Sequence, residues 1–205
     1  MTSLETLIKR AGPHITPAWE VALLFPEQGM WSEEEYLHLT NQTSRLVEFA
    51  DGVVEVLPMP SERHQDLVAF LYELLLRFAR ATGGKVYFAP FRIQLRSGKY
   101  REPDLVFLRS ADDPRRQSLF WAGADLVVEV VSPDDPDRDL VTKRREYAEA
   151  GILEYWIVNP LDETFSVLER RGDVYAEHGV FRAGETASSP SLAGMTILVD
   201  DLFSV

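Results

Sequence analysis

Residues 125–131 read DLVVEVV, and residues 154–158 read EYWIV. Both are short apolar runs typical of buried strands, and the segment between them has the spacing of one helix, from about Asp139 to Ala150, which Gly151 ends. A strand, a helix and a second strand in so short a stretch form a βαβ unit, so the two strands are predicted to be parallel neighbours. The chain is therefore expected to fold as an α/β protein.

Capping and periodicity predict two helices before this unit. Ser32 and Glu35 have the spacing of a capping box, and from Ser61 to Ala81 apolar residues recur every three or four positions, as in an amphipathic helix. The first helix should end near Asn41. The strands expected outside the unit span residues 45–49, 53–57, 85–89, 91–96 and 103–108, with the pair Asp51-Gly52 as a hairpin turn and more strands between residues 164 and 199.

The length of 205 residues suits one domain with a substantial core. Residues 1–31, through which three prolines are spaced, are expected to form an N-terminal arm, and residues 32–205 a single domain. No apolar stretch is long enough to span a bilayer, and the first ten residues lack the pattern of a secretory signal. The expectation is therefore a cytoplasmic protein with no membrane partner.

The net charge and the absence of cysteine limit the metals and ligands that the chain is expected to bind. Without cysteine, any metal must be held by oxygen or imidazole, which favours magnesium, manganese or calcium. The net charge of −12 argues against tight non-specific binding to nucleic acid, although a nuclease needs only a local basic surface. The residues that could supply such a surface, each more often a solvated side chain, are Arg92, Arg96, Lys99, Arg101, Arg138, Lys143, Arg144 and Arg145.

Glu129 is the unusual residue of the chain, because it interrupts a strand that is apolar enough to be buried on both faces. A carboxylate there needs a divalent cation, a basic side chain or a proton. Asp104 follows Pro103 at the start of another predicted strand and can point toward the same edge of the sheet. The two carboxylates would suit Mg²⁺, with waters and a backbone carbonyl such as that of Val130 completing its coordination.

Lys143 is expected to lie near this pair. On a helical wheel it sits about 60° from Leu140 and about 40° from Tyr147, which belong to the predicted buried stripe. The lysine therefore flanks the helix face that packs on the strand of Glu129, where its ammonium could orient an attacking water. A snorkelling lysine in a solvated run fits the pattern equally well. Tyr147 is interpreted as a core residue.

Several spaced motifs resemble the Uma2 family of restriction endonuclease-like proteins, in the PD-(D/E)xK nuclease superfamily. The motifs are LVEFADG at 46–52, PSERH at 60–64, EPDL at 102–105, DLVVEVVSP at 125–133, and the segment from Asp139 through Lys143 to YAEAGILEYWIV at 147–158. The resemblance covers roughly residues 32–200. It implies a restriction-endonuclease-like fold, in which a central mixed sheet is flanked by helices, with Asp104 and Glu129 as the acidic residues of the nuclease motif.

The sequence departs from the superfamily pattern at Val131, where the superfamily has its lysine. The resemblance implies that Lys143 of the following helix replaces it. It also matches Glu48 to an acidic residue that supports the metal or its water, although an exposed strand glutamate paired with a cation is as good an interpretation. His64 could contact the substrate or carry a proton, but a lone histidine at a helix start is more often structural.

These observations predict metal-assisted hydrolysis of phosphodiester bonds in DNA. Asp104 and Glu129 would hold Mg²⁺ or Mn²⁺, and Lys143 would position the attacking water. Cleavage of both strands of a duplex favours a homodimer. Two alternatives stay open: a catalytically inactive nuclease-fold protein that serves as a binding or assembly module, which Val131 and the negative charge favour, and a two-carboxylate glycoside hydrolase, which would need aromatic sugar platforms around the pair.

Overall fold

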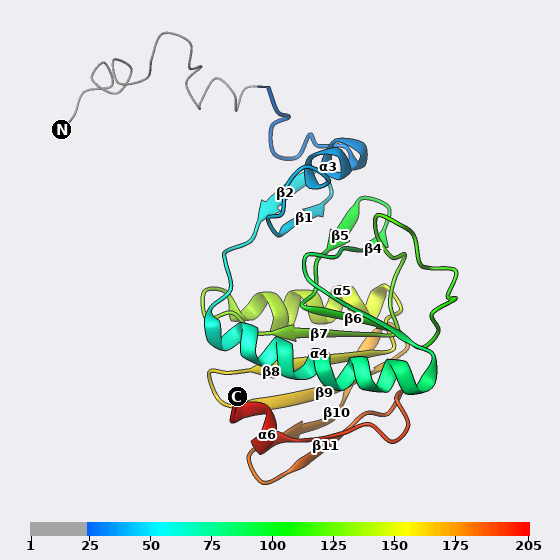
Figure 1. The fold of residues 1–205 in the computed structure, drawn as a ribbon. Coiled ribbons are helices and arrows are strands. Elements are labelled where there is room, and N and C mark those ends of the chain that lie inside the picture. The colour runs from blue at the N-terminus through cyan, green and yellow to red at the C-terminus, as the bar shows by residue number, and fades with distance from the viewer. Residues whose placement is uncertain (1–23) are drawn as a thin grey trace, which may run out of the picture.

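The computed structural model of the chain describes residues 24–205, so most of the predicted N-terminal arm, residues 1–23, lies outside the described part. Its central element is a six-stranded sheet in the order β10-β9-β8-β7-β6-β3 (Figure 1). The strands are β3 (Lys85–Phe88), β6 (Leu105–Leu108), β7 (Leu126–Val130), β8 (Glu154–Asn159), β9 (Thr164–Arg171) and β10 (Val174–Phe181). β7 and β8 are parallel and the other pairs are antiparallel, which confirms the βαβ unit and the mixed sheet.

Helices cover both faces of this sheet, as Figure 1 shows for α4 and α5. They are α4 (Glu62–Thr82), η1 (Arg138–Lys143) and α5 (Arg144–Glu149). Side chains alternate along β7, so that Val128 packs toward α4, whereas Val127 and Val131 pack toward α5. Glu129 therefore points to the α5 face, and all five residues of β7 are buried, as predicted. The fold class expected from the sequence is confirmed.

A second, four-stranded antiparallel sheet in the order β2-β1-β5-β4 lies beside the first described helix (Figure 1). Its elements are β1 (Val47–Ala50), β2 (Val53–Val56), β4 (Ile93–Arg96) and β5 (Lys99–Arg101), with α3 (Glu33–Thr40) packed against them. The predicted capping box of Ser32 and Glu35 is present. Asp51 and Gly52 have φ of 50° and 85°, the left-handed values of the expected hairpin turn.

Segments at both ends of the described chain pack on this framework. The backbone N–H groups of Gly29 and Trp31 donate to the carbonyl oxygen of Gly52, at 2.8 and 3.1 Å. The C-terminal elements are β11 (Thr186–Ser188), β12 (Thr196–Leu198) and α6 (Val199–Phe203). Between residues 24 and 205, no helix combines the length and the apolar character that a membrane span requires.

The structure corrects two details of the prediction. The helix expected from about Asp139 begins as a π-helix, Arg138–Lys143, and only Arg144–Glu149 is α-helical. A wheel with α-helical spacing therefore does not describe the position of Lys143, although the lysine is buried on the predicted side. The sequence prediction also missed β5, a strand of three residues that follows the turn at Ser97-Gly98.

Candidate active site

The candidate site is a cavity of about 290 Å³ where the two sheets meet the N-terminal end of α4. Polar side chains of Asp104, Glu129 and Lys143 line it, together with His64. An apolar wall consists of Leu46, Leu57, Pro58, Met59, Pro60 and Pro133. The structure thus brings four of the five predicted catalytic side chains to one cavity, and Val130 also lines it.

Asp104 immediately precedes β6, and Glu129 is the fourth residue of the neighbouring antiparallel strand β7. Because Leu105 of β6 pairs with Val128 of β7, the two acidic residues come to the same end of the strand pair, and both line the cavity. The Oδ2 atom of Asp104 accepts the backbone N–H of Val130 at 2.7 Å, which fixes the orientation of this carboxylate.

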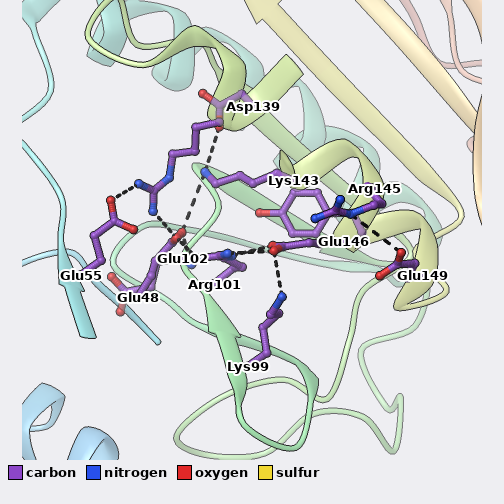
Figure 2. A network of polar contacts seen from close by, with 12 residues as sticks. Glu48, Glu55, Lys99, Arg101, Glu102, Asp139, Lys143, Arg145, Glu146 and Glu149 are labelled. Carbon is purple, nitrogen blue, oxygen red and sulfur yellow. Dashed lines mark hydrogen bonds and ion pairs between the residues drawn. The ribbon is translucent and has the colours of Figure 1, made fainter. Parts of the chain in front are cut away.

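Lys143 lies among three carboxylates in the interior, and Figure 2 shows its amino group beside the network of charged side chains. Its Nζ atom is 2.8 Å from Glu129 Oε1, 3.0 Å from Asp139 Oδ1 and 3.9 Å from Glu48 Oε1. Burial alone would lower the pKa of Lys143, but Glu129, Glu48 and Asp139 outweigh it and raise that pKa above its ordinary value. The lysine is therefore a permanent ammonium group.

Glu129 has two partners for the same oxygen. In addition to Lys143, the hydroxyl group of Tyr147 donates to Glu129 Oε1 at 2.5 Å. Burial raises the pKa of Glu129 above its ordinary value, and the Lys143 ammonium opposes that shift. Tyr147 is buried in the core, as predicted, but it is also a hydrogen-bond donor in the site, which the sequence interpretation missed.

Glu48 is fully buried on β1, so the prediction of an exposed strand glutamate is wrong, although the pairing with cations is found. Its carboxylate accepts from Arg101 at 2.7 Å (Figure 2). It also accepts from Arg138 and from the backbone N–H of Glu102, the latter at 3.1 Å. Burial would raise the pKa of Glu48, but Lys143, Arg101 and Arg138 lower it to about 2. Its neighbours therefore favour the ionised carboxylate of Glu48, which lies 3.9 Å from the Lys143 ammonium and stabilises its charge.

His64 contacts the site from the first turn of α4. The Nε2 atom of His64 lies 3.2 Å from Asp104 Oδ2, while its Nδ1 atom has no hydrogen-bond partner among residues 24–205. Burial lowers the pKa of His64, but the adjacent Asp104 carboxylate outweighs it and raises that pKa above the ordinary value. A charged His64 would therefore compete with a metal for Asp104.

Most of the basic residues that could form a phosphate-binding surface are in ion pairs with acidic side chains of the protein. Arg101 is buried and pairs with Glu48 and Glu146, so a solvated role for it is wrong. Lys99 pairs with Glu146 (Figure 2), and Arg138 bridges Glu48 and Glu55. The exposed alternatives are Arg96, bound to Asp51, and Arg145 on α5.

Two further acidic residues of the cavity were not predicted. Asp139 lies four residues before Lys143, and this spacing brings side chains together on a helix. The sequence could therefore have predicted that Asp139 contacts Lys143. Glu102 is buried beside Asp104, and its side chain accepts the backbone N–H of Val47 at 2.9 Å. No local pattern indicated that contact, which joins residues far apart in the chain.

The donor set suits a hard divalent cation, because Asp104, Glu129 and Asp139 offer carboxylate oxygens in one cavity. The Oδ1 atom of Asp139 is buried, and its partner among residues 24–205 is the Lys143 ammonium at 3.0 Å. Within the same described range, no three acidic or histidine side chains already converge with metal-ligand geometry. A cation would therefore require small shifts of these side chains.

Comparison with known proteins confirms the resemblance seen in the sequence. Residues 33–200 match the family model described as "Uma2: Putative restriction endonuclease". The crystal structure of "a putative nuclease belonging to DUF820" from Anabaena variabilis aligns with a TM-score of 0.69, over 87% of this chain and 98% of that chain, at 19% sequence identity, which shows a shared fold. No curated protein matches the chain. The extent of the family match shows that the chain belongs to the Uma2 family of restriction endonuclease-like proteins.

Proposed function

We propose that the chain is a metal-dependent endonuclease that hydrolyses phosphodiester bonds in DNA. The observation that supports this most directly is that Asp104, Glu129 and Lys143 face one cavity although they come from three separate segments of the chain: the residue before β6, the strand β7 and the helix η1. Two carboxylates can hold a divalent cation, and an ammonium group can stabilise the negative charge that develops on phosphate oxygens during phosphodiester hydrolysis. Membership of a restriction endonuclease-like family favours the same reaction class.

Asp104 and Glu129 would hold Mg²⁺ or Mn²⁺, and the carbonyl group of Val130, which lines the cavity, is the candidate backbone ligand. When bound, such an ion polarises the phosphoryl group and lowers the pKa of a coordinated water. The N–H of Val130 holds Asp104 in place before any cation arrives. The site is in this respect preorganised by the backbone of β7.

The other side chains would act on the water and on the developing charge. The Lys143 ammonium would donate a hydrogen bond to the attacking water and offset negative charge on the phosphate oxygens. Tyr147 holds the Glu129 carboxylate, and Glu48 stays ionised to hold the lysine. His64, at 3.2 Å from Asp104, is placed to orient that carboxylate or to carry a proton.

A second candidate is a catalytically inactive nuclease-fold protein that serves as a binding or assembly module. The observation that favours it is that Glu129 Oε1 already has both Lys143 and Tyr147 as partners. Val131 is buried where the superfamily has its lysine. The two candidates differ in metal binding, because an inactive module has no need of a divalent cation.

The test is cleavage of supercoiled plasmid and of defined DNA duplexes with a panel of divalent metals. The wild-type chain, Asp104→Asn and Glu129→Gln are compared with Asp112→Asn, which changes an exposed aspartate outside this cavity. We expect nicking by the wild type and Asp112→Asn, and loss of nicking by at least about a hundredfold in the site variants. Folded site variants that still cleave would contradict the proposal. A folded wild type without cleavage or Mn²⁺ binding would favour the inactive module.

We also propose that the chain acts as a homodimer, since two related sites are the simplest way to cut both strands of a duplex. Light scattering of the wild type, alone and with a duplex, measures the number of subunits. A single subunit in solution and also on the duplex would contradict the proposed homodimer. The cleavage products then report whether the cut is in one strand or in both.

A further inference from the structure

Asp139 is a buried carboxylate that the proposed reaction does not use. It is the second residue of η1, and its side chain lines the same cavity as Asp104 and Glu129. Asp139 is 4% exposed, and its Oδ1 atom has no partner among the described residues besides the Lys143 ammonium. A buried carboxylate is costly without a counter-charge, so its placement calls for a cation.

The cation near Asp139 is the ammonium of Lys143. Its Nζ atom is 3.0 Å from Asp139 Oδ1 and 2.8 Å from Glu129 Oε1, so two buried carboxylates share one positive charge. Glu48, at 3.9 Å from the same ammonium, has Arg101 and Arg138 as partners of its own. The shortage of positive charge is therefore confined to Glu129 and Asp139.

The remaining acidic residues of the cavity lack this arrangement. Glu102 accepts the backbone N–H of Val47 and lies beside β1. Glu55, Asp134 and Asp135 are exposed, so solvent stabilises their charges. Asp139 is thus, beside Glu129, the acidic residue of the cavity that combines burial with dependence on the shared Lys143 ammonium.

We propose that Asp139 is a third carboxylate of the cation site, and that the Lys143 ammonium occupies the space between Asp139 and Glu129 until a divalent cation binds. This inference rests on the proposed function, because it extends the same site. It accounts for the finding that no three acidic groups among residues 24–205 yet converge as a metal site, since the lysine separates them. Cation binding then moves the ammonium toward Glu48, which Arg101 and Arg138 keep ionised.

The first test is calorimetric titration of Mn²⁺ into the full chain after treatment with a chelator. Asp139→Asn keeps the shape of the side chain and removes its charge, and Asp137→Asn makes the same change two residues away at an exposed position. We expect Asp139→Asn to bind Mn²⁺ at least about tenfold more weakly than the wild type, and Asp137→Asn to bind within about twofold. Circular dichroism confirms that each variant is folded.

The outcomes separate this inference from the function on which it rests. If the wild type binds Mn²⁺ and both variants match it, the role of Asp139 is overturned while the two-carboxylate site survives. If the wild type binds no divalent cation, the proposed metal-dependent function itself fails. Weaker binding by Asp139→Asn alone supports the third carboxylate.

A second measurement needs no substitution at Asp139. The chain has four lysines, so the signals of lysine side chains labelled at Cε with ¹³C are readily resolved by NMR, and Lys143→Arg assigns the signal of interest. We expect the Lys143 signal to shift when Mg²⁺ is added, while those of Lys85 and Lys99 stay in place. A Lys143 signal that does not move, under conditions in which calorimetry detects binding, overturns the displacement.

Discussion

The Nζ atom of Lys143 lies 2.8 Å from Oε1 of Glu129, although the lysine belongs to η1 and the glutamate to the middle of β7. Both side chains are about 4% exposed, so solvent does not screen their interaction. Removing one partner of such a buried pair leaves an uncompensated charge in the interior. The pair therefore matters for folding as well as for the proposed chemistry.

We predict that Lys143→Met lowers the free energy of unfolding by about 3 kcal/mol or more in chelator-treated protein, because Glu129 and Asp139 lose their shared cation. Urea unfolding measures this loss. Arg145→Met is the control, since Arg145 is exposed on the adjacent α5 and should change stability by about 0.5 kcal/mol at most. Equal effects of the two substitutions would show that Lys143 is no buried counter-ion.

Tyr147→Phe removes the hydroxyl donor of Glu129. We predict a loss of about 2 kcal/mol in unfolding free energy, because hydrogen bonds to charged groups are stronger than neutral ones. Without this donor the pKa of Glu129 rises further, so half-maximal Mn²⁺ binding should move to higher pH. Tyr175→Phe is the control, as Tyr175 donates to the carbonyl oxygen of Ile152 outside the site. The same pH shift in both variants would contradict a positioning role for Tyr147.

The fold could be predicted because its decisive elements carry local signals. The apolar runs that became β7 and β8, with one helix between them, determine the parallel pair at the centre of the sheet. Glu129 was recognisable because a single acid in a buried strand needs a partner. The helical wheel predicted the side on which Lys143 is buried, although its spacing does not apply to the π-helical segment that carries the lysine.

The roles of the remaining site residues could not be predicted, because these residues make contacts between distant parts of the chain that no local sequence pattern indicates. Arg138 and Arg101 reach Glu48 from distant parts of the chain, so their pairing with Glu48 could not be predicted from the basic clusters to which they belong. The π-helical turn before α5 changes the spacing on which the helical wheel relied. The contact between Asp139 and Lys143 could have been predicted from the sequence, because residues four positions apart are neighbours on a helix.

Arg101 and Arg96 provide a matched test of burial. Arg101 is buried between Glu48 and Glu146, whereas Arg96 is half exposed beside Asp51. We predict that Arg101→Met costs about 3–5 kcal/mol of unfolding free energy, because two buried carboxylates lose a partner. Arg96→Met should cost about 1 kcal/mol or less, since solvent screens an exposed pair. Chemical denaturation measures both, and a small effect of Arg101→Met would contradict the structural role given to it.

Glu102 gives the stability of the metal-free protein a dependence on pH. Burial raises the pKa of Glu102 to about 7, with Glu48 adding to the shift and the Val47 N–H opposing it. The folded state therefore holds this proton more tightly than the unfolded state, whose glutamate has an ordinary pKa of 4.5. The resulting stabilisation is complete below the unfolded value and is lost as the pH rises through the folded value.

We predict that Glu102→Gln, which keeps a neutral acceptor for Val47, matches the wild type near pH 5 and exceeds its unfolding free energy by up to about 3 kcal/mol at pH 8. Denaturant unfolding with a chelator present, from pH 5 to pH 8, measures the difference in unfolding free energy between Glu102→Gln and the wild type. The contributions of the other titrating groups cancel in this difference. Glu34→Gln, at an exposed position of α3, controls for the loss of a carboxyl group. A difference between Glu102→Gln and the wild type that stays constant from pH 5 to 8 would mean that burial does not hold the proton on Glu102.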